Sequence, residues 1–75
     1  MRNEKFAVVL VYSTSFALRV EKMLQEINIE TKLVPVPRHL SSDCGVCVRF
    51  PIEYKARVHT LLDSQHLDYE GVFSL

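Results

Sequence analysis

Residues Phe6–Tyr12 read F-A-V-V-L-V-Y, and residues 13–15, which follow directly, read S-T-S. A continuous apolar, β-branched run without helical spacing predicts a central strand that is buried on both faces. The three hydroxyl residues Ser13, Thr14 and Ser15 are each candidates for the N-cap of a helix. This junction therefore predicts a strand that leads straight into a helix.

Apolar residues at helical spacing extend this prediction. They are Phe16, Val20, Met23, Leu24 and Ile27, with polar and charged residues between them. We expect the helix to end near Asn28, because asparagine tolerates the left-handed conformation that often closes a helix.

The rest of the chain predicts four more elements and a loop. They are a strand over residues 29–36, a polar loop over 38–45, a strand over 46–50, a helix from 51 to about 65 and a short strand within 67–75. Pro35 and Pro37 lack backbone donors, so the 29–36 strand is expected at an edge of the sheet. Pro51 suits the first turn of the second helix.

The resulting order, β-α-β-β-α-β, is that of the ferredoxin-like fold, an α+β two-layer sandwich with an antiparallel sheet and both helices on one face. In this fold the first and third strands lie side by side in the middle of the sheet. Residues 13–15 are then expected beside Cys44, although they are distant in sequence. The first strand is apolar on both faces, at Phe6, Val8 and Leu10 and at Ala7, Val9 and Val11. The sheet face without helices would therefore expose an apolar strip, which makes a homodimer one interpretation.

Composition narrows the classes of function. Nine basic and nine acidic side chains give the 75 residues a formal net charge of zero, so no broad positive surface for nucleic acid is expected. The longest apolar run, Phe6–Tyr12, is far shorter than the ~20 residues of a membrane-spanning helix, and no signal-peptide layout is present. We expect a single domain over residues 1–75, located in the cytoplasm and not in a membrane.

The chemistry is expected around Cys44. Its neighbours in sequence, Ser41, Ser42, Asp43 and Gly45, are polar or lack a side chain and do not indicate a core position. A chemical role for Cys44 is therefore favoured over packing. The thiolate is the reactive form of cysteine and forms where an anion is stabilised.

Several groups are candidates to stabilise an anion at Cys44. The hydroxyls of Ser13, Thr14 or Ser15, the unpaired amides of the helix's first turn, and the guanidinium of Arg38 can all contribute. Ser41 and Ser42 belong to the same candidate binding loop. Gly45 is expected to let the backbone approach closely and to adopt positive φ, whereas the carboxylate of Asp43 opposes a thiolate.

Cys47 leaves three interpretations open. Between two valines it fits inert or supporting packing, but it is also a candidate resolving thiol. C-G-V-C is a weak dithiol signal, because three extended steps separate the Cα atoms by ~10 Å, beyond the ~7 Å limit for a disulfide. His39, Cys44 and Cys47 offer three ligand types for zinc, whereas closed sites use four. We expect neither a metal nor another cofactor.

No catalytic triad, paired carboxylates or glycine-rich phosphate loop is present, so independent enzymatic turnover is not expected. A protein that passes an atom from its own thiol to another protein needs only one exposed cysteine and a docking surface.

The chain resembles the Se/S carrier protein-like family of small bacterial domains. The resemblance lies in S-T-S-F-A-L-R-V-E-K-M-L, in L-V-P-V-P-R and above all in S-S-D-C-G followed by V-C-V-R-F. It implies that Cys44 is the carrier, that Pro37 and Arg38 are the proline–arginine pair before it, and that the partner is a cysteine desulfurase or a selenium- or sulfur-using enzyme. A persulfide or selenopersulfide carrier is the leading hypothesis, with a dimeric regulatory module and a dithiol redox protein as alternatives.

Overall fold

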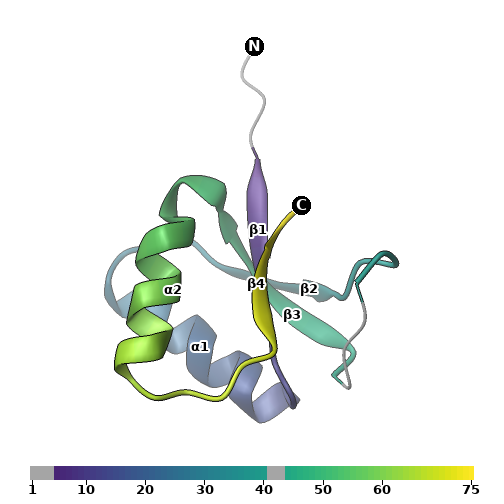
Figure 1. Cartoon of the computed structure of the whole chain (residues 1–75), viewed down its shortest axis with the longest axis horizontal. Coiled ribbons are helices and arrows are strands. Elements are labelled where there is room, and N and C mark those ends of the chain that lie inside the picture. The colour runs from purple at the N-terminus through teal and green to yellow at the C-terminus, as the bar shows by residue number, and fades with distance from the viewer. Residues whose placement is uncertain (1–4, 41–43) are drawn as a thin grey trace.

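The computed structural model describes residues 5–40 and 44–75. Its elements follow the predicted order, with one additional short helix. They are β1 (Phe6–Leu10), α1 (Thr14–Glu26), β2 (Lys32–Pro35), β3 (Val46–Pro51), the 3-10 helix η1 (Ile52–Tyr54), α2 (Lys55–Ser64) and β4 (Gly71–Ser74). Figure 1 shows their course along the chain.

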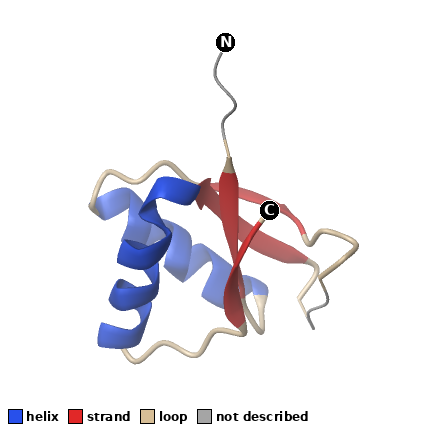
Figure 2. Ribbon diagram, turned by 45° about the horizontal axis from the view of Figure 1, so that its top comes forward, coloured by secondary structure: helices blue, strands red, loops and turns tan. Residues whose placement is uncertain are grey.

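The four strands form one antiparallel sheet in the order β2-β3-β1-β4. The expected neighbours β1 and β3 pair over five positions, from Phe6 opposite Pro51 to Leu10 opposite Cys47. Both helices cover one face of this sheet (Figure 2). The chain is thus an α+β protein with two helices on a four-stranded antiparallel sheet. The end of β1 and the start of β3 share one rim of it.

Helix α1 begins and ends with local hydrogen bonds that satisfy its terminal backbone groups. The Ser13 hydroxyl accepts a hydrogen bond from the Phe16 amide at 3.4 Å, which makes Ser13 the N-cap. At the other end Asn28 has φ 64°, as the sequence suggested. The Asn28 amide bonds to the Gln25 carbonyl and the Ile29 amide to the Leu24 carbonyl, which together form a Schellman motif.

The prediction of a strand over residues 29–36 was too long, because β2 covers only Lys32–Pro35. Ile29 is 2% exposed and belongs to the same apolar cluster as Leu24. Its amide also bonds back to the last turn of the helix. The apolar side chain at position 29 therefore closes α1 and does not start a strand.

The second helix starts later than predicted. Pro51 is the last residue of β3 with φ −62° and ψ 136°, and the 3-10 turn η1 separates it from α2. Helix α2 ends in another Schellman motif, in which His66 has φ 56° and the Leu67 amide bonds to the Leu62 carbonyl. Proline thus precedes the helical segment, and α2 itself spans Lys55–Ser64.

The main core lies between the sheet and the helices. Its buried members are Ala7, Val9, Val11, Ala17, Val20, Leu24, Ile29, Cys44, Val48, Phe50, Val58 and Leu62. The odd-numbered residues of β1 face the helices, because side chains alternate along a strand.

The opposite, open face of the sheet is covered more completely than predicted. Of the first strand's two apolar sets, the one with Val8 and Leu10 lies on this face, and these two residues are 0% and 2% exposed. They form a second cluster with Cys47, against which Val34, Val36 and Leu40 pack. The segment after β2 therefore folds over apolar positions that were expected to need a partner chain.

Strand β4 contributes to the open face as well. Phe73 lies directly opposite Val8 in the β1–β4 ladder. Its ring also lies so close to Gly71 that a Cβ added there would be 2.7 Å from it. Apolar side chains that remain in contact with solvent in and just after this strand are Phe73 (38% exposed) and Leu75 (49%), which were not part of the predicted strip.

Candidate functional site

The predicted meeting of Cys44 with the start of α1 is present in the structure. The Thr14 hydroxyl oxygen lies 3.8 Å from the Cys44 sulfur, within hydrogen-bonding range for sulfur. Thr14 is the first residue of α1, directly after the N-cap Ser13. Two segments separated by thirty residues thus meet at one rim of the sheet, where β1 ends and β3 is about to begin.

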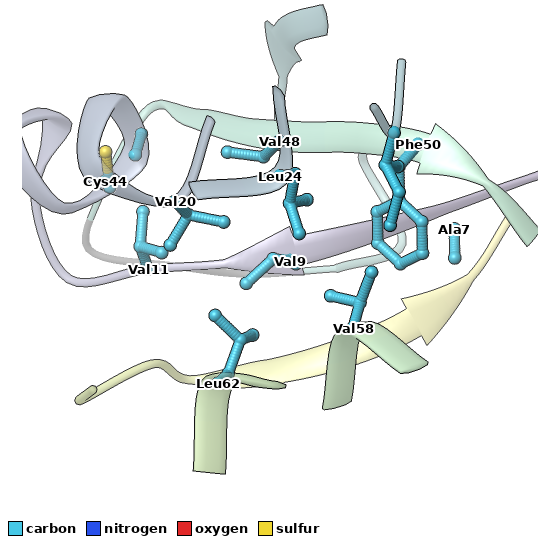
Figure 3. Close-up of a cluster of buried hydrophobic side chains, with 12 residues drawn as sticks. Ala7, Val9, Val11, Val20, Leu24, Cys44, Val48, Phe50, Val58 and Leu62 are labelled. Atoms are coloured by element: carbon cyan, nitrogen blue, oxygen red, sulfur yellow. The ribbon is translucent and has the colours of Figure 1, made fainter. Parts of the chain in front are cut away.

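The surroundings of Cys44 differ from the expectation of an exposed thiol. Its side chain is 6% exposed and belongs to the main core cluster, next to Val11 and Val20 in Figure 3. Cysteine packs like a small hydrophobic side chain, which suits this position at the margin of the core. Cys44 is therefore a shielded thiol in contact with the Thr14 hydroxyl, at the edge of an apolar cluster.

The three hydroxyl residues at the start of α1 have different roles. Ser13 caps the helix and is half-buried, while Thr14 reaches the sulfur. Ser15 is exposed on the helix surface. The sequence offered all three as equal candidates, and the helix geometry distinguishes them, since N-cap, first and second helical positions point in different directions.

The binding loop around Cys44 is described only in part. Ser41 and Ser42 lie outside the described residues, so their predicted role is still a prediction. Arg38 is exposed in a turn, and its neighbours Val36 and Leu40 pack on the open-face cluster. The segment that carries Arg38 is thus anchored on the face opposite the one on which Cys44 packs.

Gly45 does not have the conformation that we expected. Neither glycine has positive φ, and a Cβ added at Gly45 would meet nothing within 4 Å. Its carbonyl accepts a hydrogen bond from the Val36 amide at 3.2 Å. The prediction of positive φ was wrong, because the chain bends at Gly45 before β3 without using the left-handed conformation.

Cys47 lies on the other side of the sheet from Cys44. It is opposite Leu10 in the β1–β3 ladder, 0% exposed, in the open-face cluster. Its thiol donates a weak hydrogen bond to the Pro35 carbonyl at 3.9 Å. Burial, followed by the charge of Cys44, raises the pKa of Cys47, which disfavours its thiolate form. This environment fits supporting packing better than a resolving role.

The positions of the two cysteines bear on the alternatives of a disulfide and of a metal site. Both cysteines lie in the described part of the chain, and neither forms a disulfide. A bridge would require residues 44–47 to rearrange, since the two side chains pack on opposite faces. Over residues 5–40 and 44–75, no group of three or more His, Cys, Asp or Glu side chains is arranged to hold a metal ion.

Sequence reasoning missed the apolar residues that enclose the thiol. Val11, Ala17 and Val20 belong to the cluster that contains Cys44. The signal was present, because position 11 ends the apolar run and positions 17 and 20 lie on the core-facing stripe of the helix. The polar residues next to Cys44 in sequence indicated an exposed loop, so this apolar environment was not predicted.

These observations define a small α+β protein in which a shielded cysteine meets the N-terminus of a helix. Within the described ranges no helix is long and apolar enough to cross a membrane. The model of the family described as "Putative Se/S carrier protein-like" matches residues 6–74, and the chain belongs to this family. No curated protein and no solved structure matches the chain.

Proposed function

We propose that Cys44 carries sulfane sulfur or selenium, as a persulfide or selenopersulfide, and delivers it to a partner protein. Membership of the Se/S carrier-like family supports a carrier role. The observation that carries the assignment to Cys44 is its contact with Thr14 at the first turn of α1.

The transfer needs no external oxidant. The Cys44 thiolate attacks the terminal sulfur of a donor persulfide, a new S–S bond forms at Cys44, and the donor's S–S bond breaks to release a thiolate. The acceptor's thiolate then attacks the same terminal sulfur and releases the Cys44 thiolate. Each step exchanges one S–S bond for another, so the electrons balance.

The start of α1 suits an anion at this position. A helix N-terminus presents unpaired amides and a partial positive charge, and typically stabilises a nearby anion by ~0.3–1 kcal/mol. The first turn of α1 contains no acidic side chain that would oppose the stabilisation of an anion. The Thr14 hydroxyl adds a donor to the sulfur when that sulfur is ionised.

The shielding of Cys44 has a function in this proposal. A thiolate or persulfide that is open to solvent reacts readily with oxidants. With 6% exposure, the carrier sulfur is protected until a docking partner gains access to it. A cysteine desulfurase is the proposed donor, and a selenium- or sulfur-using enzyme the acceptor.

We also assign the chain to the ferredoxin-like class as one domain, on the basis of its element order and of the central β1–β3 pair. Cys47 serves as packing in this proposal, because it lies buried on the face away from Cys44.

The proposal is tested by loading the protein with a cysteine desulfurase and cysteine, followed by intact-mass and peptide mass spectrometry. The wild type should gain about 32 Da per sulfur atom, located at Cys44. Cys44→Ser should abolish the gain, whereas Cys47→Ser should retain it. An unchanged wild-type mass, or a gain that Cys44→Ser leaves intact, contradicts the assignment.

A further inference from the structure

A second candidate site lies at the rim of the sheet opposite Cys44. A pocket of about 250 Å³ is formed there by the start of β1, the end of β3 and the approach to β2. It is lined by Phe6, Glu30, Thr31, Lys32, Arg49, Phe50 and Pro51. This volume is below the ~300–1,000 Å³ of clefts for drug-sized ligands, so it suits a small ion.

Two cations meet in this pocket. Lys32 on β2 and Arg49 on β3 are directly opposite each other in the ladder, and their side chains therefore point to the same face. Like charges in this arrangement destabilise a sheet. Within the described residues neither side chain forms an ion pair or a side-chain hydrogen bond, so no direct contact with an acidic side chain there offsets the repulsion.

Arg49 is held in a defined position in spite of this. Its guanidinium carbon lies 4.2 Å from the centre of the Phe6 ring, a cation–π contact. The side chain is half-buried. A guanidinium that lies on a ring keeps its N–H edge for a planar, bidentate contact with an oxyanion. Arg49 is thus held in place before any ligand binds.

We infer that this pocket binds a small tetrahedral oxyanion of the size of phosphate, held by Arg49 and Lys32. The Glu30 carboxylate also lines the pocket, leaving a net charge of one positive unit among the lining side chains. Glu30 opposes the anion, so we expect binding in the millimolar range, about −4 kcal/mol. This inference is independent of Cys44 and of the carrier function.

The test is a ¹⁵N chemical-shift titration of the full chain with sodium phosphate, at ionic strength held constant with NaCl. We expect saturable shifts at the amides of residues 30–32 and 49–51. Arg49→Gln and Lys32→Gln should each weaken binding about tenfold or more, as a lost charge-assisted hydrogen bond does. Glu30→Gln should tighten binding about threefold, because it removes a nearby like charge.

The matched control is Lys22→Gln, which makes the same charge change on the exposed surface of α1 and should leave the affinity unchanged. Dispersed spectra of each variant establish that it is folded. A parallel titration with O-phosphoserine separates a free ion from a phosphomonoester, which the small pocket should bind more weakly. Non-saturable shifts, equal loss in the Lys22→Gln variant, or stronger binding of phosphoserine would overturn the inference.

Discussion

The contact between Thr14 and Cys44 can be tested by removing one hydroxyl. Thr14→Val keeps the shape of the side chain and removes its hydrogen bond to sulfur at 3.8 Å. We expect the rate of persulfide uptake to fall about two- to tenfold, as for the loss of a hydrogen bond worth ~0.5–1.5 kcal/mol. Loading followed by mass spectrometry over time measures this rate.

Ser15→Ala is the control for this variant, because Ser15 is the next residue in the first turn of α1 and, like Thr14, is exposed. It should load at the wild-type rate. Equal rates for wild type and Thr14→Val would show that the Thr14 hydroxyl does not assist the carrier.

Gly45 gives a second prediction at the level of single residues. Its φ is not positive and a Cβ there has open space, so Gly45→Ala should fold without strain. By restricting the unfolded chain, it should leave the free energy of unfolding unchanged or raise it by ~0.4–1 kcal/mol. Urea denaturation measures the difference.

Gly71→Ala provides the contrast. Its Cβ would meet the Phe73 ring at 2.7 Å, so the ring must move from its place and the variant should be less stable than wild type. If Gly45→Ala destabilises the protein as much as Gly71→Ala does, position 45 has a conformational requirement that its geometry does not indicate.

The helix ends offer a test of element stability. His66 closes α2 in the left-handed conformation at φ 56°, which costs a non-glycine residue ~1–2 kcal/mol. His66→Gly should therefore raise the free energy of unfolding by about 0.5–1 kcal/mol, after allowance for the greater freedom of glycine in the unfolded chain.

Gln65→Gly is the matched control for this change, because Gln65 has φ −90° and gains nothing from glycine. Thermal unfolding of both variants, followed by circular dichroism, compares them. A lower midpoint for His66→Gly than for wild type would mean that the imidazole makes a favourable interaction that outweighs the backbone strain.

The elements themselves could be predicted largely from local patterns. The positions of β1 and α1 were predicted to within a few residues. The signals were the apolar run that begins at Phe6, the apolar stripe that begins at Phe16 and the asparagine at position 28. The boundaries of β2 could not be predicted as well, since Ile29 is apolar in either environment. Whether it continues a strand or closes a helix depends on Leu24, which it contacts only in the folded chain.

For the whole molecule, the buried thiol on the open face predicts a pH dependence. Burial, with the charge of Cys44 as the second cause, raises the pKa of Cys47 in the folded state. The unfolded thiol ionises near pH ~8.5 while the folded one stays protonated, so the stabilising contribution is full below that pH and is lost as pH rises through the folded pKa.

Urea unfolding of the wild type and of Cys47→Ala, measured from neutral to alkaline pH, tests this expectation. The free energy of unfolding of the wild type should fall more steeply with pH than that of the variant. Parallel pH profiles would contradict the assigned environment of Cys47.

The location of the candidate site could be predicted, but its exposure could not. The strand order implied that Thr14 and Cys44 share a rim, and this required only the order of the elements. The shielding of Cys44 arises from Val11 and Val20, which are brought to it by β1 and α1 from elsewhere in the sequence. Likewise, Leu40 covers the open face through a turn that no local pattern indicated.

The sheet that separates the two sulfur atoms has a consequence for damage by peroxide. A sulfenic acid formed at Cys44 has Cys47 on the wrong side of the sheet, so its rescue depends on a small thiol from outside. With peroxide and glutathione we expect a mixed disulfide at Cys44 and no internal bridge, as peptide mass spectrometry would show. The protein would then depend on the glutathione pool of its surroundings to regain a usable thiol.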